Sequence, residues 1–154
     1  MNTPNAEFDK KLNTMCPDWC KWSWQNKHEA AVSDLIGKTV TAITVNEDND
    51  MLMIECSDDT AYLMFHEQDC CESVEIEDIC GDLNCLIGSP LLRAEERVST
   101  DRDKDENAGP KDNWDDSYTW TFYTFATVKG YVDIRWYGTS NGYYSESVDF
   151  VRIK

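Results

Sequence analysis

The chain has 154 residues with 30 acidic and 14 basic side chains, which gives a formal net charge of −16 at pH 7. This length fits one domain, and 41% hydrophobic residues supply enough apolar surface to build a core. The charge excludes ordinary electrostatic binding to DNA, to RNA or to an anionic membrane surface. We therefore expect a folded, acidic protein that does not bind nucleic acid directly.

The first twelve residues, MNTPNAEFDKKL, lack the apolar stretch of a signal peptide, and no window approaches the ~18 apolar residues of a membrane span. We expect a cytoplasmic protein, with no membrane partner. Seven cysteines make an odd count, which favours reduced thiols or a metal over a secreted disulfide framework. Cys70 and Cys71 are adjacent, and we expect them to be poor disulfide partners because bridging neighbours strains the peptide between them.

Residues 16–32 are expected to form a helix, because Pro17 suits a first turn and Trp19 and Trp22 follow at helical spacing. Residues 1–34 would then be an N-terminal extension carrying a Trp-rich helix. Residues 35–154 would form one α+β domain.

From Thr39 the hydrophobic pattern changes to a period of two, which is typical of strands. The segments 39–45, 51–56 and 60–65 are separated by the turn-forming runs NEDND and SDD. They predict three antiparallel strands.

The middle of the chain is less regular. We expect a short strand over 73–77, a helical turn over 77–86, and a strand or short helix over 91–100. The acidic segment near 99–114 has no large apolar residue before Trp114. It is expected to be a mobile loop in which nothing packs.

The last third predicts three more strands, over 118–128, 131–137 and 143–153. Apolar side chains occupy both faces of the first of them, so we expect this sheet to be covered on both sides, by its own core and by a helix or a partner. The fold class is α+β: mainly antiparallel sheet of about six strands, with an N-terminal helix and a short central helix.

Two motifs, HxxDCCE over 66–72 and SNGYYSExV over 140–148, resemble a family of small proteins of unknown function, DUF7448, which is common in bacteriophages and scattered in bacteria. The resemblance runs from about residue 35 to residue 150. It implies a viral setting and a shared fold, and it implies no reaction. Cys80 and Cys85 lie outside the shared pattern.

The first motif is a candidate pocket, formed by His66, Asp69, Cys70 and Cys71. Imidazole and thiolate can share a zinc ion, and Cys80 and Cys85 could complete a tetrahedron, but no C-x2-C pair is present. Alternatives are a catalytic cysteine with His66 as its base, or small buried cysteines with His66 bonded to a turn. We expect no cofactor and no bound metal, with His66, Cys70 and Cys71 as weak metal candidates.

Cys16, Cys20 and His28 offer a second set of metal-ligating side chains. On a helix His28 would lie about 12 Å beyond Cys20 along the axis, given a rise of ~1.5 Å per residue. One ion cannot easily hold all three, so a packed amphipathic helix is the favoured interpretation.

Five carboxylates form the densest acidic run, namely Glu72, Glu75, Glu77, Asp78 and Asp82. Such groups can serve acid–base catalysis or bind Ca²⁺ or Mg²⁺ when they converge in a cleft, although the spacing of a calcium-binding EF-hand is absent. A solvated acidic face that binds a partner is the alternative.

The SNGYYSE turn and the strand before it are a candidate recognition surface, because Tyr, Trp and Arg dominate interfaces. Its binding residues are Arg135, Tyr143, Tyr144 and Glu146, with Trp136 beside Arg135. Alternatively, the two tyrosines straddle a hairpin, one in the core and one outside.

The negative charge is concentrated in residues 33–90, which hold fourteen acidic side chains and Lys38 as the one base, a net charge of −13. We therefore favour a non-enzymatic, phage-type accessory or anti-defence protein that binds a basic surface of a host protein and imitates a nucleic-acid backbone. The alternative is a small-molecule-binding domain or small enzyme using the His66 and SNGYYSE region. The sequence leaves the oligomeric state open.

Overall fold

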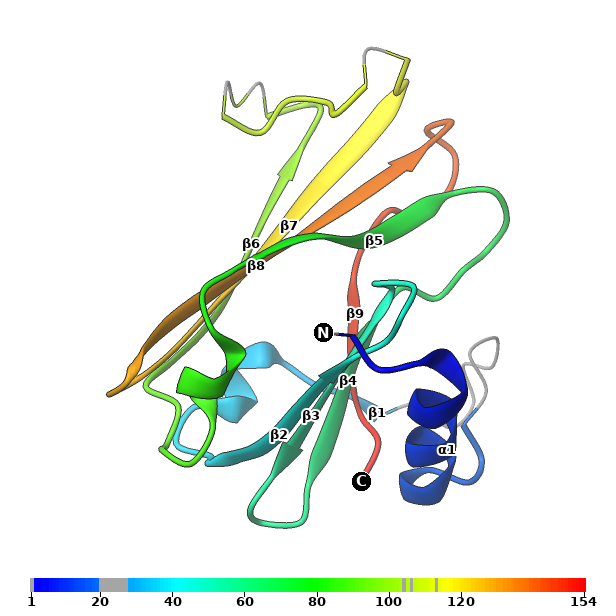
Figure 1. Cartoon of the computed structure of the whole chain (residues 1–154). Coiled ribbons are helices and arrows are strands. Elements are labelled where there is room, and N and C mark those ends of the chain that lie inside the picture. Colours follow the sequence, from blue (N-terminus) through cyan, green and yellow to red (C-terminus); the bar gives the residue numbers. More distant parts are fainter. Residues whose placement is uncertain (1, 20–27, 104, 106, 113) are drawn as a thin grey trace.

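The computed structural model describes residues 2–19, 28–103, 105, 107–112 and 114–154. Two antiparallel sheets face one another, and one helix, α1 (Asn5–Met15), lies beside the first sheet (Figure 1). Within the described residues, no helix is long and apolar enough to cross a membrane.

The first sheet has five strands in the order β1-β9-β4-β3-β2. Their bounds are β1 (His28–Glu29), β2 (Val40–Val45), β3 (Met51–Cys56), β4 (Ala61–Phe65) and β9 (Asp149–Arg152). The three strands expected over 39–65 are confirmed as β2, β3 and β4, paired antiparallel in sequence order. The final strand is shorter than expected, because residues 143–148 form an irregular loop before β9.

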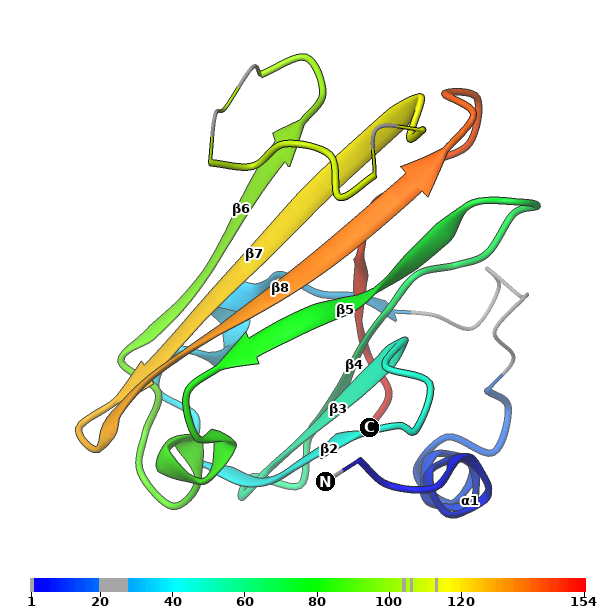
Figure 2. The ribbon, with the colours of Figure 1, turned by 45° about the horizontal axis from the view of Figure 1, so that its top comes forward.

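The second sheet has four strands in the order β5-β8-β7-β6 (Figure 2). Their bounds are β5 (Ser73–Cys80), β6 (Arg93–Thr100), β7 (Ser117–Thr127) and β8 (Gly130–Ser140). The described residues thus form nine strands, more than the six expected. The central helix is reduced to the short 3-10 helices Val32–Leu35 and Leu83–Leu86.

The main core lies between the two sheets. Tyr123 and Phe125 on β7 and Trp136 on β8 point inward and are 0–1% exposed. Trp136 Nε1 donates to Met64 Sδ on β4 at 3.2 Å, which connects the sheets at the centre. The alternation along β7 and β8 therefore places one face in the core, as period-two patterns require.

The outer face of the first sheet is covered by α1 (Asn5–Met15). Phe8 and Leu12, one helical turn apart, are 0% and 2% exposed and pack on the apolar face of β3 and β4. This cover explains why β4, and β3 apart from Glu55, consist of apolar residues, as strands buried on both faces do.

The structure therefore has an N-terminal helix, at Asn5–Met15. The prediction of a helix over 16–32 is wrong for residues 16–19 and 28–31, which the structure describes. Pro17 and Asp18 form a turn after α1, and residues 28–29 form β1. Pro17 follows the end of one helix and does not begin another. The positions 20–27, with Cys20, Trp22 and Trp24, lie outside the described residues.

The outer face of the second sheet is partly covered by the loop between β6 and β7. Ala108 is 3% exposed and packs against Trp120 and Tyr137. Trp120 Nε1 donates to Gly109 O at 2.8 Å, and Tyr137 Oη donates to Asp115 at 2.6 Å. The expectation that nothing in this loop packs was wrong, because a methyl group, one backbone carbonyl and one carboxylate of the loop meet the aromatic side chains.

Candidate functional site

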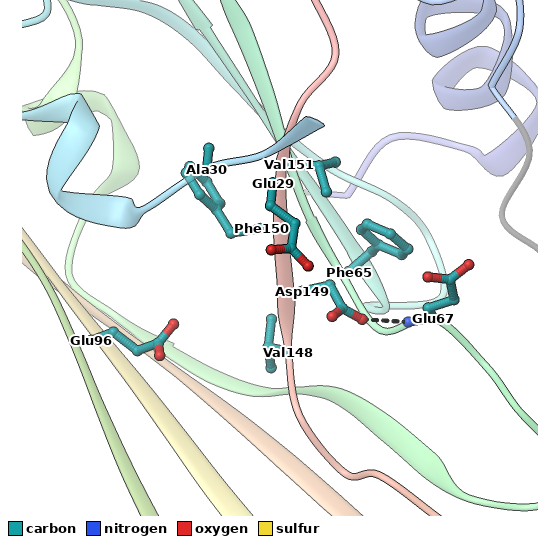
Figure 3. A pocket seen from close by; sticks show the side chains of 9 residues that line it. All are labelled: Glu29, Ala30, Phe65, Glu67, Glu96, Val148, Asp149, Phe150 and Val151. Carbon is teal, nitrogen blue, oxygen red and sulfur yellow. Dashed lines mark hydrogen bonds between the residues drawn. The ribbon is translucent and has the colours of Figure 1, made fainter. Parts of the chain in front are cut away.

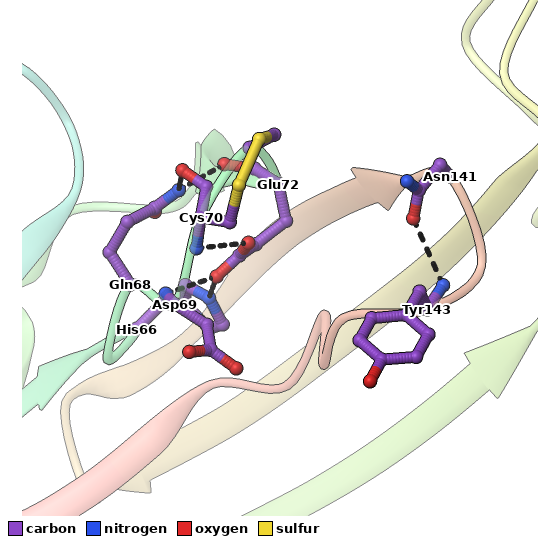
Figure 4. Close-up of a disulfide and its surroundings, with 8 residues drawn as sticks. His66, Gln68, Asp69, Cys70, Glu72, Asn141 and Tyr143 are labelled. Atoms are coloured by element: carbon purple, nitrogen blue, oxygen red, sulfur yellow. Dashed lines mark hydrogen bonds and ion pairs between the residues drawn. A yellow bond between two sulfur atoms is a disulfide. The ribbon is translucent and has the colours of Figure 1, made fainter.

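The two sequence motifs meet at one end of the sandwich, around His66 (Figure 4). His66 Nδ1 lies 2.6 Å from Ser147 O, and Nε2 lies 2.9 Å from Glu72 Oε1. His66 and Glu72 are both buried, at 4% exposed each. Both partners are acceptors, so the ring satisfies both only when each nitrogen carries a proton.

The Glu72 carboxylate accepts the hydrogen bonds that hold the loop after β4. It accepts the backbone N–H of Asp69 at 2.6 Å and that of Cys70 at 3.1 Å, besides the His66 ring. Burial alone would raise the pKa of Glu72, but these hydrogen bonds, with that from Asp69 first, lower it to about 2. The carboxylate stays ionised inside the protein, so Glu72 holds a loop together and is not on the solvated acidic face.

Cys70 and Cys71 are joined by a disulfide on the surface of this loop (Figure 4). The expectation that these neighbours would not pair is corrected by this bond. Gln68 donates to Cys70 O at 3.1 Å, and the Glu72 carboxylate accepts the Cys70 N–H, so the loop that carries the disulfide closes on itself. No group of three or more His, Cys, Asp or Glu side chains in the described chain is placed to hold one metal ion.

The SNGYYSE loop is anchored by Glu146, which is 8% exposed. Its carboxylate accepts the hydroxyls of Thr119, at 2.8 Å, and Ser140. Glu146, predicted as a binding residue, is thus an internal anchor. Tyr143, which packs edge-to-face on Tyr144, is 83% exposed and stands at the loop surface.

A small pocket of about 120 Å³ lies beside His66 and is lined by His66, Asp69, Ser145 and Ser147, among others. Small-molecule sites usually measure about 300–1,000 Å³, so this pocket is small for a substrate. The His66 ring is already engaged at both nitrogens, and the sulfur atoms of Cys70 and Cys71 are bonded to each other. The geometry therefore does not bring an imidazole base to a thiol.

The acids of β5 lie on the outer face of the second sheet, at its edge. Arg135 on β8 forms ion pairs with Glu77, at 3.0 Å, and with Asp78, at 3.2 Å. Glu75 is exposed on the same strand, whereas Trp136 points to the core. The structure thus brings together four of the predicted binding residues, Arg135 with three carboxylates, and Asp82 follows the end of β5.

Two further acids join this group from a distant part of the sequence. The Ile76 N–H on β5 donates to Asn49 O in the β2–β3 turn at 2.7 Å, so the turn lies against the edge strand (Figure 2). Glu47 and Asp48 in that turn are exposed. We call the combined surface of Glu47, Asp48, Glu75, Glu77 and Asp78 the acidic edge.

Sequence reasoning missed Glu47 and Asp48. The run NEDND is visible in the sequence as an acidic turn, but nothing in its pattern shows which strand of a second sheet it will touch. The missing information is a long-range backbone contact.

The family model described as a domain of unknown function (DUF7448) matches residues 33–150. The chain therefore belongs to this family, as the two motifs indicated. No curated protein and no solved structure matches the chain. The matched region contains both sequence motifs that meet around His66 and the whole acidic edge.

Proposed function

We propose that this protein is a non-enzymatic interaction protein that binds a basic surface of another protein through the acidic edge. The observation that carries the proposal is the 2.7 Å backbone hydrogen bond between Ile76 and Asn49. It joins the acids of the β2–β3 turn to those of β5, so that two acidic runs separated in sequence form one surface.

The charge balance of the acidic edge favours a cationic partner. Five carboxylates share this surface with one guanidinium, that of Arg135, which pairs with Glu77 and Asp78. Lys38, the single base of residues 33–90, is engaged elsewhere by Asp58 at 2.5 Å. Exposed carboxylates that keep their water contribute little to stability, and complementary charge increases both the rate and the specificity of association.

The target class that we propose is a nucleic-acid-binding protein of a bacterial host. Carboxylates spaced along an edge can occupy the sites that phosphates would take on such a protein. The resemblance of the motifs to a family common in bacteriophages supports an accessory or anti-defence role in the host cytoplasm.

The test is capture of proteins from bacterial lysate by the immobilised protein at low and at physiological salt. We expect basic proteins to be retained and to be released steeply by salt, because exposed charges are screened beyond about 8 Å at physiological ionic strength. The double variant Glu47→Lys, Glu75→Lys should lose this capture. Both side chains are exposed and neither is in an ion pair with a described residue. The substitutions remove one long contact, that of the Glu47 carboxylate with the Asn5 N–H at 3.5 Å, so the fold should be retained.

The matched control is Asp101→Lys, Asp116→Lys, which makes the same change in net charge beside the β6–β7 loop, at the ends of two strands that β8 separates from β5. This variant should retain most of the capture. If both double variants lose capture equally, only the total charge matters and the acidic edge is not a binding surface.

A further inference from the structure

Cys70 and Cys71 form a disulfide between neighbours in the chain, at exposed positions of the loop after β4 (Figure 4). A disulfide stabilises a protein mainly by restricting the unfolded chain, and this effect is smallest for the shortest loops. The bond between Cys70 and Cys71 encloses no intervening residue. It therefore adds little stability, while its exposed position leaves the pair open to attack by other thiols.

The loop is held by hydrogen bonds that do not involve the two sulfur atoms. At its base, the Glu67 N–H donates to the Asp149 carboxylate on β9 at 2.8 Å (Figure 3). Nearer the disulfide, the Glu72 carboxylate accepts the Cys70 N–H, and the Gln68 amide donates to the Cys70 carbonyl. These contacts can persist when the disulfide opens. The two cysteines would then stay in place, so that the same bond can form again.

The surroundings of the disulfide carry negative charge. Asp69, the residue directly before it, is exposed. No Lys or Arg occurs in the sequence over residues 39–92 or in the SNGYYSE loop. The buried His66 ring is already paired with the Glu72 carboxylate at 2.9 Å. An anionic thiol is therefore repelled from this loop, whereas a thiol with an ammonium group beside its sulfur is attracted.

We propose that the Cys70–Cys71 disulfide is a reversible thiol–disulfide exchange site for cationic thiols. The thiolate of the incoming molecule attacks one of the two sulfur atoms. As the new S–S bond forms, the Cys70–Cys71 bond breaks. The attacking sulfur is oxidised, and the displaced sulfur is reduced, leaves as a thiolate and takes a proton from water. In the reverse step the displaced cysteine, again as a thiolate, attacks the mixed disulfide, expels the cationic thiol and restores the original bond.

The exchange site is distinct from the acidic edge. Neither cysteine belongs to that surface, and Asp69 does not belong to it either. The exchange chemistry therefore holds or fails independently of the proposed function.

The test compares cysteamine, a cationic thiol, with mercaptopropionate, an anionic thiol of similar size. The rate of opening at Cys70 and Cys71 in the native, whole protein is measured by acid quenching and peptide mass spectrometry, per concentration of thiolate. Each rate is divided by that of the same thiol with uncharged hydroxyethyl disulfide, which cancels the intrinsic reactivity of the two thiols.

We expect the protein to prefer cysteamine at least about fivefold, because two unit charges about 4 Å apart in water change a rate by about this factor. Removal of cysteamine should restore the Cys70–Cys71 bond. No preference for cysteamine, no reaction at these cysteines, or a mixed disulfide that persists after the thiol is removed would overturn the proposal.

Asp69→Asn removes the charge next to the disulfide and keeps the backbone N–H that Glu72 accepts. It should lower the preference for cysteamine by about threefold or more. The matched control is Asp59→Asn, which removes the same charge at the other end of β4, beyond the reach of screened charges of about 8 Å. Asparagine tolerates the positive φ of 66° at residue 59, so the turn should be retained.

The control should change the preference by less than about 1.5-fold, since β4 spans about 17 Å at ~3.4 Å per residue. If Asp59→Asn and Asp69→Asn lower the preference equally, only the total charge matters and the loop is not a selective site.

A cysteine flanked by two arginines in a peptide offers the same chemistry as a free aminothiol. An Arg-Cys-Arg peptide, measured beside cysteamine in the same way, distinguishes the two sources. A faster reaction of the peptide would identify a basic protein segment as the co-reactant. A faster reaction of cysteamine would identify a free aminothiol.

A stability measurement separates exchange from a structural role. In the double variant Cys70→Ser, Cys71→Ser, the urea midpoint should match that of the wild-type protein, because the bond restricts little of the unfolded chain. A clearly lower midpoint would show that the disulfide braces the loop, and would overturn its assignment as an exchange site.

Discussion

The backbone of Glu146 lies directly against Gly138 on β8. A Cβ atom at residue 138 would be 2.7 Å from Glu146 O and 3.1 Å from Val74 Cγ2. The absence of a side chain on β8 therefore lets the SNGYYSE loop cross the strand and insert the Glu146 carboxylate between Thr119 and Ser140.

Gly138→Ala should lower the free energy of unfolding by about 1–3 kcal/mol, because backbone atoms must shift to admit the methyl group. Urea denaturation measures this. Gly109→Ala is the control, since no atom lies within 4 Å of a Cβ there, and we expect a change within about 0.5 kcal/mol. Equal effects of the two substitutions would show that the close approach of Glu146 does not matter.

Glu72→Gln should destabilise the protein by about 1–3 kcal/mol at pH 7. Three donors point at the Glu72 carboxylate, and the amide nitrogen of glutamine would face at least one of them. The folded-state pKa of Glu72 is about 2, below the ordinary value of 4.5, so its stabilisation is complete above about pH 4.5.

This stabilisation is lost as the pH falls from about 4.5 toward about 2, because the carboxyl group then takes up a proton in the folded protein. Urea midpoints of the wild-type protein and the Gln variant should therefore converge at low pH. Glu75→Gln, at an exposed position, should behave like the wild type at every pH. A pH-independent gap for Glu72→Gln would contradict the role of the ionised carboxylate.

Tyr137→Phe should loosen the loop between β6 and β7. The Lys111 N–H donates to Tyr137 Oη at 3.1 Å, and that hydroxyl donates to Asp115 at 2.6 Å. Burial and the Asp115 carboxylate raise the pKa of Tyr137, so the hydroxyl keeps its proton as a donor. Hydrogen exchange at Lys111 should accelerate, with a loss of about 0.5–1.5 kcal/mol in stability. Unchanged exchange there would show that the loop is held by other contacts.

The Cys70–Cys71 disulfide predicts a simple labelling pattern. Alkylation of denatured, unreduced protein should modify Cys16, Cys56, Cys80 and Cys85, which are free. Cys70 and Cys71 should be modified only after a reductant is added. Peptide mass spectrometry reads both states. Labelling of Cys70 and Cys71 without reductant would support the original expectation of reduced thiols.

The sequence was a good guide where the pattern was local. The strands β2, β3 and β4 were predicted nearly residue for residue, because period-two patterns end at recognisable turns. The last strand was overestimated because residues 143–148 carry strand-forming side chains, yet the hydrogen bonds of Glu146 hold them in a loop. A side chain bonded to a distant strand overrides local propensity.

The candidate site was harder to predict than the strands. Spacing alone could not show that Glu72 would be buried under His66 while Glu75, three residues later, would be exposed. The meeting of residue 66 with residue 147 depends on the pairing of β4 with β9. Such pairing is a property of the whole sheet and leaves no mark in either motif.

The packing of α1 has a consequence for where the unit of folding begins. The family match starts at residue 33, after both α1 and β1. A shortened protein that began there would lose Phe8 and Leu12 and would leave the apolar side chains of Met53 and Leu63 in water. Apolar surfaces that are exposed to solvent in this way make proteins self-associate. A protein shortened in this way would therefore need a different N-terminal segment, a binding partner or a second copy of itself to shield this face.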